Sequence, residues 1–357
     1  MEVSARIVTL ELAQTFVISR ESVDTVDVVQ VELRDGDQVG HGEAAPIERY
    51  DQTAESALAY IEEHAQHVDR LDWVYEASDE PAARSALDAA LHDLRAKQTG
   101  QPAWRMLGLK RSGPPTSWTI WLGDPDDMAR RAAETHAANR FRRLKLKLGA
   151  RDGLDVERVR AVRAVTDVPL QVDVNEYWTL DEALDALPEL QALRVEYCEQ
   201  PLPQSDPGGP ELRRRSPIPI YVDEDCHTLA DVDACAEIAH GINIKLAKSG
   251  GVTEALRMVE RARELGLGVM VGCMIESGLG IAAACLVSTL CDHADLDGNL
   301  LLRHDPWPGV ELVDGVQTLS DAPGLGVACD ADVRSAGYAR APSEMTGRAQ
   351  ASSDERT

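Results

Sequence analysis

Lysine is scarce in this chain. Its 357 residues include only six lysines, against thirty arginines, and four of the six fall in two short segments, Leu144–Leu148 and Ile244–Lys248. Arginine stays protonated in proteins, whereas lysine can lose its proton when neighbouring groups lower its pKa. Lysines at two strand-like sites, in a chain that otherwise uses arginine, therefore suggest proton transfer. The alternative is that they are ordinary surface lysines.

Other missing features exclude whole classes of protein. A formal net charge of −25 argues against nucleic acid or an anionic membrane surface as a partner. No apolar stretch reaches the ~18 residues of a membrane span. Seven cysteines without a CxxC pair favour free thiols in a reducing compartment, and the first residues show no signal-peptide pattern. We therefore expect a cytoplasmic protein that binds neither nucleic acid nor membranes.

Residues 1–112 read as a separate α+β unit. Its strand patterns precede its helical patterns, and in order these segments are Arg6–Leu12, Thr25–Leu33, Val39–Gly42, Thr53–Val68 and Pro81–Lys97.

Residues 113–320 follow a different pattern, in which short apolar runs alternate with amphipathic segments. The eight runs are Trp118–Leu122, Arg143–Leu148, Leu170–Val174, Arg194–Cys198, Ile218–Asp223, Ile242–Ala247, Gly268–Ile275 and Ala294–Asp297. The alternation predicts an α/β fold of the (β/α)₈ TIM-barrel type. A doubly wound open sheet is the structural alternative, but no glycine-rich phosphate loop follows a strand. We expect residues 321–340 to complete the N-terminal capping domain and residues 341–357 to be disordered.

Polar residues stand at the ends of seven consecutive predicted strands. A single one is more often a structural cap, but active sites of such barrels lie at the C-terminal strand ends, so seven in succession predict a site there. These residues are Lys145, Lys147, Asp173, Asn175, Glu199, Asp223, Glu224, Lys245, Lys248, Glu276, Asp295 and Asp297.

Three of these carboxylates point to a metal. Asp173, Glu199 and Asp223 come from adjacent strands and would repel each other unless a cation lay between them. They offer only oxygen ligands, which favours a hard ion such as Mg²⁺.

The lysines suggest how a proton would move. Lys147 and Lys245 lie on the second and sixth predicted strands, which are opposite in an eight-stranded barrel. One ammonium group can take a proton from one face of a substrate while the other returns it to the opposite face. Lys145 and the metal would lower the pKa of Lys147, and the metal would stabilise the enediolate formed beside a carboxylate. Lys248, just past the strand end, would only pair with neighbouring carboxylates.

In this order and spacing the segments resemble the enolase superfamily, and within it the muconate-lactonising subgroup. The resemblance is carried by Lys145-Leu146-Lys147, Val172–Asn175, Glu199–Pro201, Val222–Glu224 and Ile242–Leu246. It implies a capping domain on a barrel, Mg²⁺ on the three carboxylates, and two catalytic lysines.

Further segments are similar to the dipeptide epimerases of that subgroup. Asp295-Leu296-Asp297 resembles their DxD pair, which holds the free ammonium of a dipeptide, and two carboxylates two residues apart on a strand share a face. Glu276 lies in a similar seventh strand, and Thr119 in a similar first strand. Arg20 stands where Ala-Glu epimerases carry an arginine, although it could equally be a surface residue.

The resemblance therefore implies Mg²⁺-dependent epimerisation of a dipeptide of the L-Ala-D/L-Glu type, with specificity on the cap loops Phe16–Ser22 and Glu48–Asp51, by a protein expected to be a homo-oligomer. An N-acyl amino acid racemase or an o-succinylbenzoate synthase-like enzyme is the close alternative. Asp295 and Asp297 discriminate, because an N-acylated substrate has no ammonium group. An inactive metal-binding paralogue is the alternative of another class.

Overall fold

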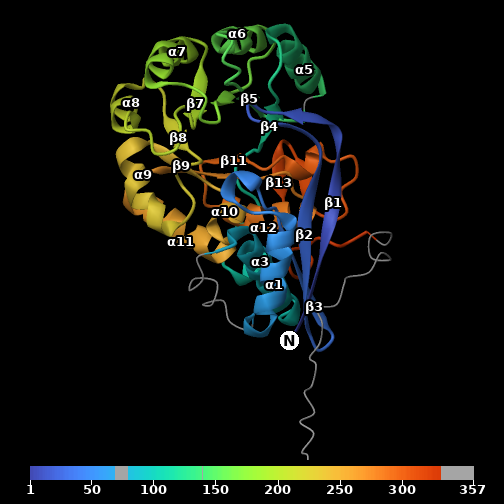
Figure 1. Ribbon diagram of the computed structural model, residues 1–357. Coiled ribbons are helices and arrows are strands. Elements are labelled where there is room, and N and C mark those ends of the chain that lie inside the picture. Colours follow the sequence, from blue (N-terminus) through green and yellow to red (C-terminus); the bar gives the residue numbers. More distant parts are fainter. Residues whose placement is uncertain (69–78, 139, 331–357) are drawn as a thin grey trace, which may run out of the picture.

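A closed ring of eight parallel strands forms the centre of the molecule. The computed structural model describes residues 1–68, 79–138 and 140–330 (Figure 1). The strands lie side by side in chain order, and a parallel bridge between Thr116 and Ala294 joins the first to the last. They are β4 (Ser117–Ile120), β5 (Arg143–Lys147), β6 (Leu170–Asp173), β7 (Val195–Glu199), β8 (Ile220–Val222), β9 (Gly241–Ile244), β10 (Gly268–Gly272) and β11 (His293–Asp295).

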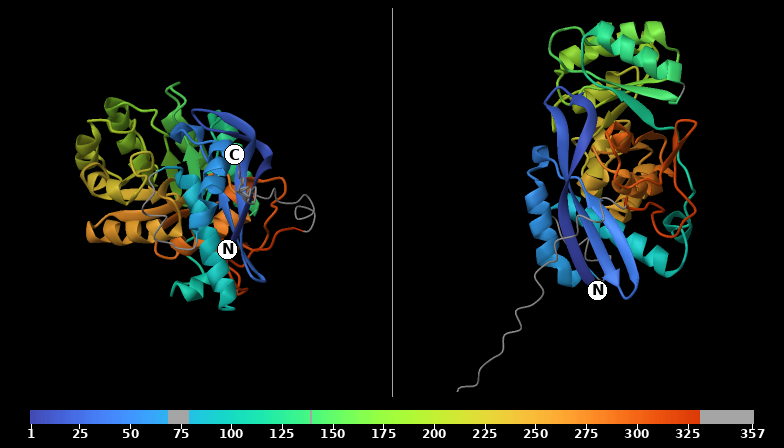
Figure 2. Two further views of the ribbon diagram at one scale, coloured as in Figure 1. Left: turned by 60° about the horizontal axis from the view of Figure 1, so that its bottom comes forward. Right: turned by 90° about the vertical axis from the view of Figure 1, so that its right-hand side faces the viewer.

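Helices surround this ring on its outer side (Figures 1 and 2). Each buries its apolar residues against the strands, as Met128 and Ala132 do, because burial of apolar area is what holds the two layers together. The helices are α5 (Pro125–Ala138), α6 (Asp155–Val165), α7 (Leu180–Ala192), α8 (Gly209–Arg215), α9 (Val232–Ile238), α10 (Leu246–Ser249), α11 (Val252–Glu264) and α12 (Gly278–Ser288), with 3₁₀ turns η3 (Leu229–Asp231) and η4 (Gly298–Leu301).

Each of the eight predicted runs overlaps one observed strand, so the barrel prediction is confirmed. The sixth and seventh runs extend three residues past the end of their strands. The sixth strand ends at Ile244, and Lys245 is already the N-cap of α10. The seventh ends at Gly272. Their apolar character continues past the strand because the next turn is also buried, which a hydrophobic pattern cannot distinguish from more strand.

The N-terminal unit is an antiparallel sheet backed by helices. Its strands are β1 (Glu2–Val17), β2 (Ser22–Asp35) and β3 (Gln38–Ala44), and its helices are η1 (Glu48–Tyr50), α1 (Ala54–His64), η2 (Ala65–His67) and α3 (Pro81–Gln98). Gly40 and Gly42 let α3 approach closely, since a Cβ atom at either would lie about 2 Å from the backbone oxygen of Ala90 or Ala86. The β1–β2 hairpin reaches the barrel beside β4, where Leu122 N donates to Val17 O at 3.1 Å (Figure 2).

The C-terminal segment returns to this unit, which confirms that part of the fold prediction. Before it, within the segment predicted as barrel, lie β12 (Glu311–Val313) and β13 (Val316–Thr318), and α4 (Ala103–Met106) contacts the segment at Gly324. Ala103 N donates to Gly324 O at 2.7 Å, and Leu325 N to Asp93 Oδ1 at 2.7 Å. The domain boundaries at residues 112 and 320 stay predictions. Residues 331–340 of the predicted C-terminal segment, and residues 341–357, predicted to be disordered, lie outside the described residues.

Among the described helices, none combines the length and apolar character needed to cross a membrane.

Candidate active site

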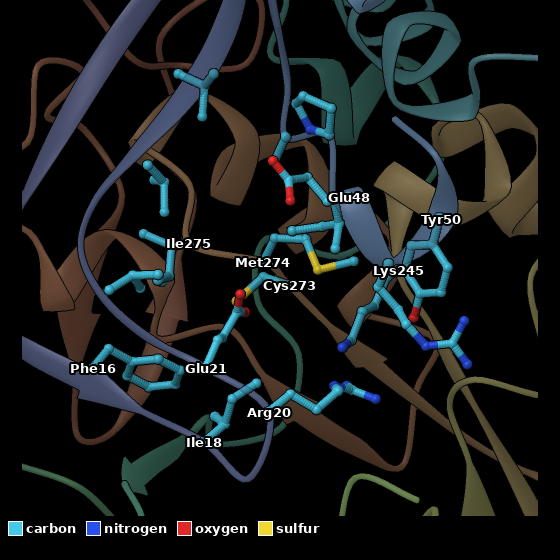
Figure 3. A pocket seen from close by; sticks show the side chains of 18 of the residues that line it. Phe16, Ile18, Arg20, Glu21, Glu48, Tyr50, Lys245, Cys273, Met274 and Ile275 are labelled. Atoms are coloured by element: carbon cyan, nitrogen blue, oxygen red, sulfur yellow. The ribbon is translucent and has the colours of Figure 1, made fainter. Parts of the chain in front are cut away.

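A cavity of about 780 Å³ lies between the cap loops and the C-terminal ends of the barrel strands (Figure 3). Both predicted specificity loops contribute to its lining. The predicted site residues that line it are Arg20, Thr119, Lys145, Lys147, Asp223, Lys245, Asp295 and Asp297. Asp173, Glu199 and Glu276 are buried and are not part of this lining.

Strand register brings the first lysine group and two carboxylates together. Lys147 pairs with Asp173 across β5 and β6, and Asp173 pairs with Glu199 across β6 and β7. Lys147 Nζ therefore lies 2.7 Å from Asp173 Oδ2. Lys145, two residues earlier on the same strand face, lies 2.7 Å from Glu199 Oε2 and 2.6 Å from Asp295 Oδ2. It is buried and forms the centre of this group.

A second lysine group faces Asp223. Lys245 Nζ lies 2.7 Å from Asp223 Oδ2, and Lys248 Nζ lies 2.6 Å from Asp223 Oδ1. Lys248 thus pairs with a neighbouring carboxylate, as expected. Burial would raise the pKa of Asp223, but the two lysines hold that pKa well below its usual range.

Two lysines of the site have pKa values set by the carboxylates around them. Burial alone would lower the pKa of Lys145 and of Lys245. The surrounding carboxylates outweigh burial, Asp295 and Glu199 at Lys145 and Asp223 at Lys245, so that both pKa values lie above the ordinary one. The distances between these lysines and the carboxylates of other strands cannot be read from the sequence.

The three predicted metal ligands fit a hard cation by their chemistry. In residues 1–68, 79–138 and 140–330, no three carboxylate, imidazole or thiol groups are close enough to hold a metal, and lysine ammonium groups contact all three of these carboxylates. Asp173, Glu199 and Asp223 are nevertheless fully buried, offer only oxygen, and follow three adjacent strands. Burial raises the pKa of Glu199 to about 7, so this carboxylate has less positive charge around it than a buried anion needs.

The aspartate pair stands at the end of the last strand, β11, where Asp295 adjoins Lys145 of the first lysine group. Asp295 ends β11, whereas Asp297 is the N-cap of η4, so the two do not share one strand as predicted, yet both line the cavity. Thr119 N donates to Asp297 Oδ2 at 2.7 Å. Within the described residues Asp295 Oδ1 has no hydrogen-bond partner. Burial and the neighbouring Asp295 raise the pKa of Asp297 to about 7.

Arg20 enters the cavity from the β1–β2 loop and is held by two carboxylates. Its Nη1 donates to Glu176 Oε2 at 2.6 Å, and its Nη2 donates to Glu224 Oε1 at 2.7 Å. Burial alone would lower the pKa of Arg20, but these carboxylates hold it above its ordinary value. Figure 3 shows Arg20, Tyr50 and Lys245 on one side of the cavity and the apolar Phe16 on the other.

Glu276, a predicted substrate-binding residue, does not line the cavity. Its Oε1 accepts from Met274 N at 2.8 Å within its own loop, and it is not part of the cavity lining. Burial raises its pKa to about 7. A contact between Glu276 and a substrate stays a prediction.

Several residues of the site were missed by sequence reasoning. Asn243 Nδ2 donates to Glu199 Oε1 at 2.8 Å. It stands two residues before Lys245, on the same strand face, so the period of the strand carried a signal for it. Glu176 and Arg49 bind each other across the cavity mouth at 3.1 Å, and no local pattern relates residues 127 positions apart.

The chain was compared with known protein families. A family model described as "Enolase C-terminal domain-like" matches residues 127–333, and one described as "Mandelate racemase / muconate lactonizing enzyme, N-terminal domain" matches residues 1–108. The L-Ala-D/L-Glu epimerase of Bacteroides thetaiotaomicron is 39% identical over 330 residues, which cover 89% of this chain and 85% of that protein.

Solved structures give the same grouping. An enolase family member from Agrobacterium tumefaciens with homology to dipeptide epimerases, bound to sodium and L-Ala-L-Glu, superposes with a TM-score of 0.83 at 37% identity, covering 89% of this chain and 98% of that chain. A dipeptide epimerase from Enterococcus faecalis V583, complexed with Mg and L-Leu-L-Tyr, gives a TM-score of 0.87 at 29% identity, covering 92% and 99%. With both family models and these likenesses over most of its length, the chain belongs to the enolase superfamily, in its mandelate racemase and muconate lactonizing group.

Proposed function

We propose that this protein is a Mg²⁺-dependent epimerase that inverts the second residue of an L-Ala-containing dipeptide, of the L-Ala-D/L-Glu type. The observation that carries the proposal is the placement of Lys147 and Lys245. They follow β5 and β9, four strands apart in a ring of eight, and line one cavity together with Asp295 and Asp297. Two likenesses support the proposal: the relative from Bacteroides is named an L-Ala-D/L-Glu epimerase, and the structure from Agrobacterium contains L-Ala-L-Glu.

The two lysines would act as the acid and the base. The lysine on one face, in its neutral form, takes the α-proton, and the electron pair of that C–H bond moves toward the adjacent carboxylate. The lysine on the other face, in its charged form, gives a proton to the same carbon. The carbon is then inverted, and the two lysines have exchanged protonation states, which solvent protons restore. Positioned acids and bases contribute about 10²–10⁴-fold to such a step.

Asp173, Glu199 and Asp223 would hold the metal ion. Bound Mg²⁺ would offset the negative charge of the substrate carboxylate and of the deprotonated substrate. Lys145 would add a fixed positive charge behind this site, because it already contacts Glu199 and Asp295.

Asp295 and Asp297 would receive the ammonium group of the dipeptide. The free Oδ1 acceptor of Asp295 supports this role, and Thr119 would fix Asp297 through its backbone N–H. Arg20 would face the side chain of the second residue from the cap.

Exchange of the substrate α-proton in D₂O tests the proposal. With Mg²⁺ present, L-Ala-L-Glu should lose its second α-proton signal in ¹H NMR and yield the other epimer, and a chelator should stop both until Mg²⁺ is restored. Exchange with N-acyl amino acids but with no dipeptide would instead assign the racemase activity. No exchange with any substrate would point to an inactive paralogue.

Asp295→Asn with Asp297→Asn provides the matched test of the ammonium site. We expect this double variant to lose dipeptide turnover, and intact turnover would contradict the assignment. A cytoplasmic homo-oligomer also stays a prediction. Light scattering after size exclusion checks the assembly, and a mass near 38.9 kDa would contradict it.

A further inference from the structure

One carboxylate, that of Glu176, joins both cap loops to the barrel. Its Oε2 accepts from Arg20 Nη1 at 2.6 Å, and its Oε1 accepts from Arg49 Nη2 at 3.1 Å. Arg20 belongs to the β1–β2 loop and Arg49 to the β3–α1 connection. Glu176 Oε1 also accepts from Gln204 N, in the loop after β7, at 2.9 Å. Four segments that are distant in sequence thus meet at one side chain.

The backbone at Glu176 is strained in a way that fits a functional position. Asn175 and Glu176 have φ angles of 50° and 76°, in the left-handed region that non-glycine residues rarely adopt. Two such residues in succession persist only where their surroundings hold them, and such strain gathers at functional sites. Here Glu176 N donates to Gln200 O at 2.8 Å, which fixes the strained turn directly after β6.

The carboxylates of these ion pairs are more buried than those of surface pairs in the same chain, although the Arg49 side chain itself is 38% exposed. The Glu176 side chain is 11% exposed and the Glu224 side chain is fully buried. In the surface pair Arg194–Asp167 the two side chains are 67% and 92% exposed. Exposed pairs contribute little because water and salt screen them, whereas charge-assisted hydrogen bonds of a buried carboxylate are strong.

We propose that Glu176 is a positioning residue that closes the cap loops over the cavity and aims Arg20 at the side chain of the substrate's second residue. Glu176, Arg20, Arg49, Glu224 and Gln204 together form what we call the Glu176 latch. The latch holds the Nη1 and Nη2 atoms of Arg20 on Glu176 and Glu224, and so fixes the plane of the guanidinium group before substrate arrives. The part of this inference that concerns substrate rests on the proposed dipeptide epimerase activity.

The first test needs no substrate. Glu176→Gln keeps the size of the side chain and an acceptor for Gln204 N, but removes the charge that holds the two arginines. We expect trypsin to cleave the Arg49–Tyr50 bond about tenfold faster in native Glu176→Gln than in the wild type, as followed by mass spectrometry. Cleavage after Arg142, which pairs with Asp314, should not change. An unchanged rate after Arg49 would overturn the latch.

The second test separates positioning from catalysis. Glu176→Gln should raise KM for L-Ala-L-Glu about tenfold and leave kcat within about threefold, because the lysines are untouched. The increase in KM should be smaller for L-Ala-L-Ala, which has no charged side chain for Arg20 to meet. Glu211→Gln, which breaks the exposed Arg215 pair on α8, serves as the matched control and should change neither constant. Faster cleavage with an unchanged KM would contradict the positioning role.

Arg49→Gln reaches the latch from the other side. Arg49 is exposed, so this variant should fold normally, and it should raise KM less than Glu176→Gln does, since Arg20 keeps its own pairs. The double variant Glu176→Gln with Arg49→Gln should have the same KM as Glu176→Gln alone, because both changes remove the same ion pair between Glu176 and Arg49. Fully additive effects would contradict the latch. If the wild type turned over no dipeptide, the proposed function would fail, and the tryptic comparison would still decide the latch.

Discussion

Some buried carboxylates of the site lie against lysines that hold their charge, and others carry a charge that burial disfavours. Lys147 and Lys145 overcome the effect of burial and lower the pKa of Asp173 to about 2. Burial raises the pKa of Asp297 and of Glu276 to about 7, and it does the same at Glu199 and Glu224. A carboxylate of the site is thus readily charged at Asp173 and Asp223, where lysines lie against it, and charged only at a cost at the other four.

This difference in pKa between the carboxylates indicates where a bound cation would offset negative charge. Asp173 and Asp223 already have lysines beside them, whereas burial raises the pKa of Glu199 and of Glu224 to about 7. Near β11, Lys145 contacts Oδ2 of Asp295, and an incoming ammonium group would add positive charge beside Asp295 Oδ1 and Asp297. A dipeptide with a free amino group matches this division of charge, whereas an N-acylated substrate does not.

The largest expected effect comes from removing one of the two proposed catalytic lysines. Lys147→Ala should slow α-proton exchange from one epimer on the order of a thousandfold and affect the other epimer less, and Lys245→Ala should show the converse. Exchange of both epimers, followed by NMR in D₂O, measures this. Lys110→Ala, at an exposed position, is the control. Equal losses from both epimers would contradict the assignment of one lysine to each face.

A second prediction concerns Glu43, a buried carboxylate of the cap that contacts Ser277 of the barrel. Glu43 of β3 accepts from Ser277 N at 2.7 Å and from Gln30 Nε2 at 3.1 Å. Burial raises its pKa from 4.5 to about 7, so the folded protein disfavours the charged form. The stability that the neutral form provides is present below pH 4.5 and is lost as the pH rises from about 4.5 to about 7.

Glu43→Gln removes this loss. Between pH 5 and pH 8 the free energy of unfolding should fall on the order of 2 kcal/mol more in the wild type than in Glu43→Gln, as measured by urea denaturation at several pH values. Glu189→Gln, at an exposed site on α7, should follow the wild type. Parallel curves for Glu43→Gln and the wild type would show that Glu43 is already ionised without cost in the fold.

The smallest of these effects is expected at the cap. Arg20→Gln should raise KM for L-Ala-L-Glu about tenfold while kcat stays within about threefold, because Arg20 would bind substrate without moving a proton. Steady-state kinetics with Arg142→Gln as the control measures this. A thousandfold loss of kcat would instead indicate that Arg20 takes part in the proton-transfer step.

The period of the sequence located the barrel and most of its rim. Strand residues alternate in direction, so Lys145 and Lys147, two positions apart, had to share a face. Parallel strands of one barrel end at one rim, so Asp173, Glu199 and Asp223 had to be neighbours. The residues of the helix α12 are buried on all sides, so its sequence carries no amphipathic period that would predict a helix.

The sequence by itself determined the strand order, the lysines at opposite strands and the acidic rim, because these follow from local periodicity and chain connectivity. Only the tertiary structure decided which charges meet. Arg20 could not be assigned from its position in the chain, and its place between Glu176 and Glu224 depends on loops that lie far apart in sequence. The pKa of Lys145 likewise depends on carboxylates of three other strands, since electrostatic interactions follow distance in space and burial, which no one-dimensional pattern contains.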